Sequence, residues 1–218
     1  FMNAWFANEK QKLADQVGHR LKGGMEKAFA RFSQRLAFSM FEMKLNEVSY
    51  RPQIQHPLAD DSSDSSDSEA RAHEPPMPHR DHARRWDAFF SNKDEDTVNA
   101  RRGCPLRKLG GEASARYSFV HQSFLEYFIA ERLWQVLMKG ERLHLRKAQT
   151  LWGTRGLTQV PKLPVVIDFL ADRAKQNHDA RLRLLTLVQA SRGQAPESPA
   201  ALAAANAVTV FNQVASLS

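Results

Sequence analysis

His121 is the residue whose type and position carry the most specific chemistry. It lies where an extended run, residues 115–120, meets a long apolar run, residues 121–139, which is typical of a buried helix. The first N–H groups of a helix have no partner within the helix and carry partial positive charge, so this end favours a phosphate. A neutral imidazole there can donate one ring N–H to an anion. Three roles stay open on these grounds: phosphate contact, capping of its own helix, or packing in the core.

Cys104 is the single cysteine, and arginines at 101, 102 and 107 lie near it in the sequence. Nearby positive charge can lower the pKa of a thiol and make the sulfur reactive. No positioned histidine base is evident, so a structural cysteine is the favoured interpretation. A lone cysteine excludes a disulfide framework and a cysteine-based zinc finger, and it favours a reducing compartment, the cytosol or the nucleus.

Two further patterns suggest a metal site, and a simpler interpretation is favoured for each. The run "PVVID" (164–168) resembles an apolar strand that ends in a magnesium-binding aspartate, but Asp168 and Asp172 are spaced as on an exposed helix face. His73, His79 and His82 lie in a Pro-rich stretch without cysteine support, which favours a solvated loop. We therefore expect no metal site.

The chain lacks the motifs of several enzyme classes. There is no G-x-x-x-x-G-K-[ST] phosphate loop, no G-x-S-x-G elbow and no H-E-x-x-H pair. The chain by itself is therefore not expected to be an enzyme. No run approaches the roughly 20 apolar residues that span a bilayer, and the first residues lack the apolar run of a secretory signal.

Charge is unevenly distributed over the 218 residues, whose net charge is +7. Residues 59–100 carry 5 basic and 11 acidic side chains, whereas residues 101–218 carry 17 basic and 8 acidic ones. The stretch 57–86 is rich in Ser, Pro and acids and cannot bury enough apolar area to offset the entropy of ordering, so it is predicted to be a disordered loop. The basic remainder raises nucleic acid as an alternative partner, although solvated helix faces are the more ordinary explanation.

The remaining elements follow from periodicity and turn signals. Helices are predicted over 1–17 and about 25–45; in the second, one face is shared by Phe29, Phe32, Leu36, Met40 and Met43. Residues 47–50 suggest a short strand, residues 86–102 one or two short helices, and residues 104–109 and 115–120 a β-hairpin. Residues 141–160 are expected to be an irregular linker anchored by Trp152. Three more helices follow; the first starts at Pro164, and the other two have Asp179 and Ser198 as N-caps.

The run "YSFVHQSFLEYFIAERL" (117–133) resembles the winged-helix motif of NACHT-type STAND nucleotide switches. In that family a pattern close to F-x-H-x-S-[FL]-x-E-[YF]-[FT]-A recurs at this junction. The matching positions here are Phe119, His121, Ser123, Phe124, Glu126, Tyr127, Phe128 and Ala130. The segments before and after the motif resemble, in order, those that flank it in multidomain NACHT proteins.

The resemblance implies a mainly α fold with four parts. Residues 1–20 would end a preceding helical domain, and 21–140 would form a winged-helix-like domain with one short β-hairpin and the disordered insert 57–86. Residues 141–160 would be a linker, and 161–218 a small, solenoid-like helical domain leading to downstream repeats. The chain would then be part of a longer protein.

The resemblance also implies a function: the regulatory lid of a cytoplasmic ADP/ATP signalling switch. The winged-helix histidine, here His121, would contact the β-phosphate of ADP, while Phe119, Phe124 and Tyr127 would hold its helix against the winged-helix core. ADP or ATP with Mg²⁺ would bind an upstream NACHT domain and not this chain alone. That domain and the downstream repeats would be intramolecular partners, and exchange for ATP would permit homo-oligomerisation.

Two other classes of function remain as alternatives. A winged helix can bind nucleic acid, but a DNA reader exposes the polar face of its recognition helix, and the helix 121–139 is too apolar for that. The switch is therefore favoured. The third class is a structural scaffold whose nucleotide role has been lost; there, replacing His121 would leave ADP retention unchanged.

Overall fold

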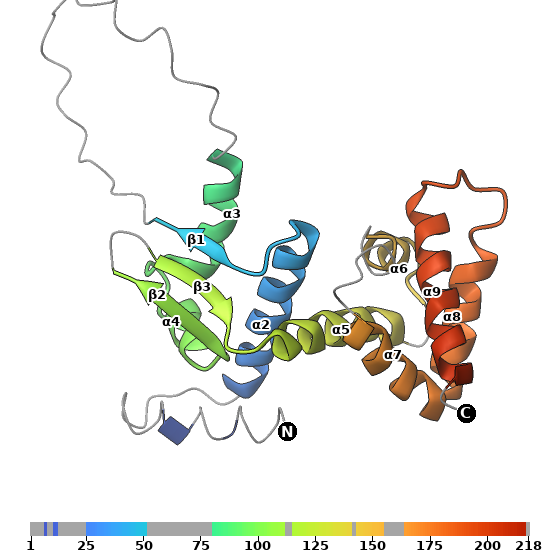
Figure 1. Ribbon diagram of the computed structural model, residues 1–218, viewed down its shortest axis with the longest axis horizontal. Coiled ribbons are helices and arrows are strands. Elements are labelled where there is room, and N and C mark those ends of the chain that lie inside the picture. Colours follow the sequence, from blue (N-terminus) through green and yellow to red (C-terminus); the bar gives the residue numbers. More distant parts are fainter. Residues whose placement is uncertain are drawn as a thin grey trace, which may run out of the picture.

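The computed structural model describes residues 7, 11, 12, 25–51, 80–111, 115–140, 143–154 and 164–216, without the side chains of 80–84 and 164 (Figure 1). Several predicted features lie outside this description. They are the helix expected over residues 1–17, most of the stretch 57–86, the side chains of His73, His79 and His82, and part of the linker expected over 141–160.

The first half of the described chain combines helices with a small sheet. Its elements are α2 (Met25–Glu42), β1 (Val48–Tyr50), α3 (Arg80–Phe90), α4 (Glu95–Arg102), β2 (Leu106–Gly110), β3 (Ala115–Phe119) and α5 (Gln122–Met138). The strands form one antiparallel sheet in the order β1–β3–β2, with Val48 opposite Tyr117 and Leu106 opposite Phe119. Along the chain, one helix and one strand are followed by two helices and then two strands, and the last strand is the central one of the sheet. This is the arrangement of a winged helix. The predicted mainly α fold with a winged-helix domain is confirmed, and so is the hairpin.

Strand β3 shows why this sheet packs on one face. Ala115, Tyr117 and Phe119 are buried, whereas Arg116 is exposed and Ser118 half-buried. Successive strand side chains point to opposite faces, so the apolar set faces the helices. The strand expected at 47–50 is confirmed as β1, which covers the free edge of β3 opposite β2.

Aromatic side chains fill the space between the sheet and α3. Tyr117 of β3 stacks on Phe90 with ring centroids 4.1 Å apart, and Tyr50 of β1 lies 5.7 Å from the same ring. The Tyr50 hydroxyl donates a hydrogen bond of 2.7 Å to Asp87 of α3. Trp86 is also buried. This cluster fixes α3 to the sheet through burial of large apolar rings.

The second half is entirely helical in the part that the structure describes. Its elements are α6 (Leu145–Trp152), α7 (Pro164–Gln176), α8 (His178–Gln189) and α9 (Pro199–Ser216), and α9 packs against each of the other three. Within the described ranges, no helix is both long and apolar enough to cross a membrane.

Helix α5 joins the two halves. In Figure 1 it runs across the centre of the molecule, with α2 and the sheet toward one end and α6–α9 toward the other. Its inner positions are almost completely buried, among them Phe128, Ile129, Leu133 and Leu137. The buried residues form one hydrophobic cluster that runs from Met25 in α2 to Val210 in α9. The predicted burial of this helix is confirmed, and a single core continues across the expected linker.

The C-terminal end of α5 is closed by a side chain from α8. Arg183 donates to the carbonyls of Leu137 and Gly140, at 3.0 and 2.8 Å. The last carbonyls of a helix have no partner within it, and a cation there also matches the helix dipole. Gly140, just after the helix end, has a φ of 73°, a left-handed conformation that favours glycine.

Two sequence-based expectations about segments of the chain are wrong in detail. Residues 145–152 of the expected irregular linker form α6, because the fully buried Trp152 gives this segment an apolar face to pack. The predicted disorder of 57–86 is wrong at its end, since α3 starts at Arg80.

The N-cap of α8 is Asn177 and not Asp179. The Asn177 side chain accepts a hydrogen bond of 2.9 Å from the backbone N–H of Ala180, and its φ of −128° is extended. Because α7 runs on to Gln176, only Asn177 lies between the two helices and takes the cap position. For α9 the prediction is confirmed, since Ser198 Oγ accepts from the N–H of Ala201 at 3.2 Å.

Candidate functional site

His121 occupies the N-cap of α5, directly after β3. Its backbone is extended, with φ −144° and ψ 146°, and its Nδ1 accepts a hydrogen bond of 3.2 Å from the backbone N–H of Ser123. The side-chain oxygen of Ser123 lies 2.8 Å from the same nitrogen. The ring is exposed at the end of the sheet. Of the three roles left open by the sequence, capping of its own helix is therefore what the geometry shows, and phosphate contact stays a prediction.

The cap also determines which ring nitrogen carries the proton. An imidazole nitrogen that accepts from a backbone N–H carries no proton itself, so the neutral ring holds its proton on Nε2. No other side chain in the described part of the protein forms a hydrogen bond with Nε2. His121 thus presents one N–H donor at a helix N-terminus, where backbone N–H groups also favour an anion.

Glu126 lies one turn further along α5 and is buried, with 3% of its surface exposed. Gln122 Nε2 donates a hydrogen bond of 3.3 Å to its Oε1. Burial raises the pKa of the Glu126 carboxyl, and the hydrogen bond from Gln122 and the electrostatic interaction with His121 oppose that rise. The carboxyl is thus held under the start of α5, next to the N-cap.

The aromatic residues of the motif fix α5 in two directions. Phe119, Phe124 and Phe128 are buried on the winged-helix side, and the rings of Phe119 and Phe128 lie 5.7 Å apart. Tyr127 differs from the expectation, because its ring packs edge-on against Phe169 of α7 at 5.7 Å. The motif therefore connects the start of α5 to the sheet and to the helices that follow.

A salt bridge supports the Tyr127 contact. Arg173 of α7 pairs with Glu131 of α5 at 2.5 Å, and its guanidinium lies 6.0 Å from the centre of the Tyr127 ring and 5.6 Å from that of Trp134. The carboxylate is largely covered, which shields the pair from solvent more than an exposed pair would be. A displacement of the first turns of α5 would therefore be transmitted to α7.

Cys104 has a structural role. Its Sγ donates to the carbonyl of Ala100 at 2.9 Å and accepts from Ser33 Oγ at 3.0 Å. Burial raises the pKa of the thiol to about 12, and the Ser33 contacts lower it by less. The alternative of an activated thiol is therefore wrong, because neighbours in the sequence such as Arg107 do not compensate for desolvation of the sulfur.

The metal-site patterns are not supported in the described part of the chain. Asp168 lies on α7, as the helical interpretation predicted, and its Oδ1 accepts from Gln213 Nε2 of α9 at 2.7 Å. Within that part, no group of three or more His, Cys, Asp or Glu side chains is placed to hold a metal ion.

Helix α4 is the second of the two helices that lie between β1 and β2 in the described chain. Its N-cap is Asp94, and Glu95 and Asp96 lie in its first turn. Arg101 near its end donates to Phe90 O and Asn92 Oδ1, both at 2.7 Å. Acidic groups repel phosphates, so the first turn of α4 adds no support for nucleic acid as a partner.

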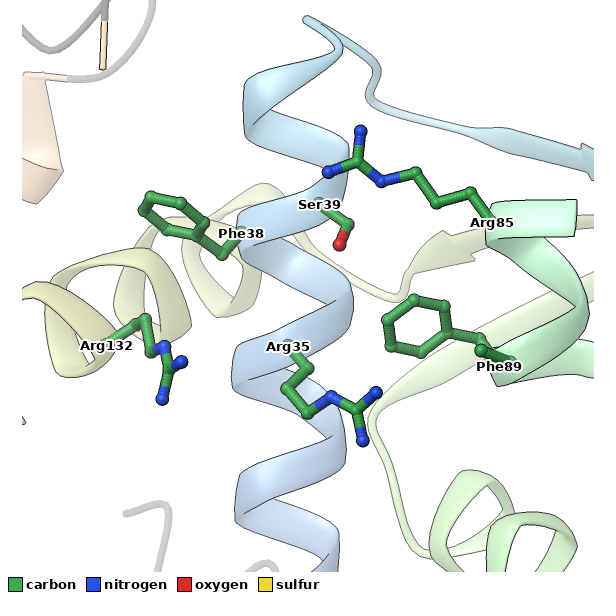
Figure 2. A pocket seen from close by; sticks show the side chains of 7 residues that line it. Arg35, Phe38, Ser39, Arg85, Phe89 and Arg132 are labelled. Carbon is green, nitrogen blue, oxygen red and sulfur yellow. The ribbon is translucent and has the colours of Figure 1, made fainter. Parts of the chain in front are cut away.

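Sequence reasoning missed a cavity of about 360 Å³ beside α2. Three arginines from three helices line it, together with aromatic and small side chains: Arg35, Phe38, Ser39, Arg85, Ala88, Phe89 and Arg132 (Figure 2). No spacing rule connects positions 35, 85 and 132, because only the packing of α3 and α5 against α2 brings them together. We call this cavity the three-arginine pocket.

Comparisons with protein-family models, with curated proteins and with solved structures found no match for this chain. The resemblance to NACHT-type switches therefore stays a prediction, which rests on the motif residues around His121.

Proposed function

We propose that this chain is the regulatory lid region of a NACHT-type ADP/ATP switch. The observation that carries the proposal is the orientation of His121, whose Nδ1 is occupied by Ser123 and whose Nε2–H is left as a donor at a helix N-terminus. In the proposal, this donor contacts the β-phosphate of ADP bound to an upstream NACHT domain, in the cytoplasm. The nucleotide and its Mg²⁺ are bound by that domain, and this chain performs no catalysis.

The energetics suit a switch. A hydrogen bond to a charged group contributes about 1.5–3 kcal/mol, so losing it shifts an equilibrium by roughly tenfold or more. A ligand changes a conformational equilibrium only through contacts that differ between the two states. ADP would hold the lid closed through His121, and exchange for ATP would release it and permit oligomerisation.

The packing of α5 supports transmission of such a change. Phe119 and Phe128 tie its start to the sheet, and Tyr127 ties it to Phe169 of α7. Side chains packed at interior density move together and do not deform one by one. Movement at His121 would therefore be passed to α7–α9 and, in the proposal, to the downstream repeats.

The test distinguishes the capping role of His121 Nδ1 from the proposed donor role of its Nε2–H. His121→Ser keeps an N-cap oxygen for the Ser123 N–H but removes the ring donor, so the helix should keep its stability. In the full-length protein with its nucleotide domain, we expect ADP to dissociate about tenfold faster, which follows from one lost charged hydrogen bond. Release of a fluorescent ADP analogue measures the rate.

His144→Ser is the matched control. His144 is also exposed and also the N-cap of a helix, α6, where its side chain forms no cap hydrogen bond. Unchanged ADP release in His121→Ser would overturn the proposal and bring the scaffold function forward. Equal acceleration in both variants would also contradict it, because the effect would then not depend on the ring at position 121.

A further inference from the structure

The three-arginine pocket lies beside the middle of α2, where three helices meet. In Figure 2, Arg35 projects from α2, Arg85 comes from α3 on one side, and Arg132 comes from α5 on the other. The volume of about 360 Å³ is in the range of cavities that bind small molecules. The pocket can therefore hold a compact ligand in contact with all three helices.

The positive charge of this pocket is only partly balanced by the protein. None of the described residues that line it is acidic. Arg85 Nη2 pairs with Glu42 at the end of α2. Neither Arg35 nor Arg132 forms a salt bridge with any carboxylate among the residues that the structure describes. Two guanidinium groups from different helices therefore face one cavity without a counter-charge.

Carboxylates next to the pocket residues in the sequence are engaged elsewhere. Glu131, which precedes Arg132, pairs with Arg173 of α7 at 2.5 Å. Asp87 of α3 accepts the hydrogen bond of 2.7 Å from the Tyr50 hydroxyl. Both acids are thus held by partners outside the pocket and do not compensate its charge. A counter-charge for Arg132 is left to a ligand.

An aromatic wall holds one of the uncompensated arginines at the pocket. The guanidinium of Arg35 lies 5.5 Å from the centre of the Phe89 ring. Phe38 and Ala88 complete the apolar part of the lining, and the hydroxyl of Ser39 adds a neutral donor. The pocket thus combines apolar walls with donors from α2, α3 and α5.

The charge of the lining indicates which kind of anion it suits. Arginine binds both carboxylate and phosphate through paired N–H groups. A phosphate group carries a charge of about −1.5 to −2 near neutral pH and three acceptor oxygens, whereas a carboxylate carries a single charge and two oxygens. Within one small cavity, phosphates therefore balance several guanidinium groups more completely than carboxylates do.

The placement of the arginines indicates the shape of the ligand. In Figure 2, Arg132 approaches from one side of α2 and Arg85 from the other, and Arg35 lies between them. The three guanidinium groups are spread along the cavity and do not converge on one point. One phosphate would contact one of them at a time, whereas a ligand with several phosphates at separate positions would match their arrangement.

We propose that the three-arginine pocket binds a small organic polyphosphate, free in solution, whose phosphates are carried at separate positions of a compact frame. The bound ligand bridges α2, α3 and α5 and supplies the counter-charge for Arg35 and Arg132. Because surface charges are screened by salt, its affinity falls as ionic strength rises. The inference does not depend on nucleotide binding or on His121, so either proposal can fail without the other.

The test uses the full chain with inositol hexakisphosphate as the probe. In isothermal titration calorimetry we expect saturable binding of one probe molecule per chain, and binding of inorganic phosphate weaker by about tenfold or more, because one phosphate makes fewer charged hydrogen bonds. The site is located by NMR. The backbone amide signals of Ser39 and Ala88 should shift during the titration, and those of α9 should not.

Variants that remove the arginines identify the partners. Arg35→Gln with Arg132→Gln should weaken binding by about a hundredfold, since each lost charged hydrogen bond corresponds to roughly tenfold or more. Arg146→Gln with Lys147→Gln removes the same charge from exposed positions of α6 and should leave the affinity nearly unchanged. Circular dichroism melts establish that the variants fold.

A second pair of variants keeps every arginine in place. Ala88→Glu adds a carboxylate at an exposed position of the lining, where it competes with the phosphates of the probe and should weaken binding by about tenfold or more. Glutamate is a good helix former, so α3 should stay intact. Ala205→Glu puts the same charge on an exposed position of α9 and should have little effect.

Four results would overturn the proposal. The first is the absence of saturable binding, and the second is equal weakening by the pocket variants and their controls, which would indicate general attraction to a chain of net charge +7. The third is inorganic phosphate that binds as tightly as the probe. The fourth is binding to vesicles that contain phosphatidylinositol 4,5-bisphosphate without binding of the free probe, because the source of the phosphates would then be a lipid headgroup.

Discussion

The indole N–H of Trp152 donates a hydrogen bond of 3.2 Å to the carbonyl of Leu133, which joins the end of α6 to the middle of α5. Trp152 is completely buried. Its own carbonyl accepts from Asn206 Nδ2 of α9 at 2.5 Å. One residue in the segment expected to be a linker thus connects three helices, and it explains why this segment is ordered.

Trp152→Phe should destabilise the protein markedly. The change leaves space in a filled core and removes a buried hydrogen bond, and together these effects cost about 2–4 kcal/mol. Urea denaturation followed by circular dichroism measures the difference. The control is Trp134→Phe on α5, where the indole is half-buried. If the two variants lose the same stability, the Leu133 contact is not what holds α6.

Gly153 marks a close approach between α6 and α9. A Cβ at this position would lie 2.3 Å from the Pro199 carbonyl oxygen and 2.8 Å from Pro199 Cα, both of them backbone atoms that cannot rotate away. We therefore expect Gly153→Ala to destabilise the protein by about 1–3 kcal/mol or more, as overpacking does. Thermal melts measure the effect.

Gly111→Ala provides the comparison for Gly153. A Cβ at Gly111 would meet nothing within 4 Å. It should leave the melting temperature nearly unchanged. Equal destabilisation by both substitutions would contradict the prediction, because it would show that the contact with Pro199 does not determine the result; the loss of unfolded-chain entropy on replacing Gly by Ala is itself stabilising.

Cys104 should make the fold sensitive to alkaline pH. Burial raises the pKa of its thiol from 9.0 to about 12, so the folded state keeps a proton that the unfolded chain releases above pH 9. This contribution to stability is present below pH 9 and is lost as the pH rises toward 12. The slope contributed by one such group is at most about 1.4 kcal/mol per pH unit.

Cys104→Ala isolates that slope. Free energies of unfolding from urea titrations between pH 8 and about 10.5 should fall more steeply in the unchanged protein than in Cys104→Ala. Parallel curves would contradict the prediction. A thiol reagent gives an independent measurement, because Cys104 should react only as the protein unfolds.

Glu126 should weaken the fold as the pH rises from the acid range toward neutrality. Burial raises the pKa of its carboxyl above 4.5, so the protonated form is favoured in the folded state. This stabilising contribution is complete below pH 4.5 and is lost as the pH passes the higher pKa of the folded state. Glu126→Gln imitates the protonated carboxyl, and its stability relative to the unchanged protein should increase between pH 4 and pH 7.

The measurement for Glu126 is urea denaturation at a series of pH values. Glu95→Gln, at an exposed position of α4, controls for the change in net charge. A stability difference that is the same at every pH would be evidence against a shifted carboxyl pKa at Glu126.

Much of the local structure could be predicted from the sequence alone. The apolar spacing of α2 and α5, the alternation in β3 and the cap at Ser198 are properties of neighbouring residues, and they determined helices and strands to within a few positions. The position of His121 at a strand–helix junction follows from the same local patterns, whereas the structural role of Cys104 depends on its burial and on its contact with the distant Ser33.

Tertiary structure alone decided the rest. The segment 145–152 became a helix because Trp152 found Leu133 and Asn206, and Asn177 took the cap of α8 because α7 ends beside it. Arg35, Arg85 and Arg132 share a pocket because three helices pack together. Contacts between residues far apart in the chain depend on how the whole core closes, and no local pattern of residues records that.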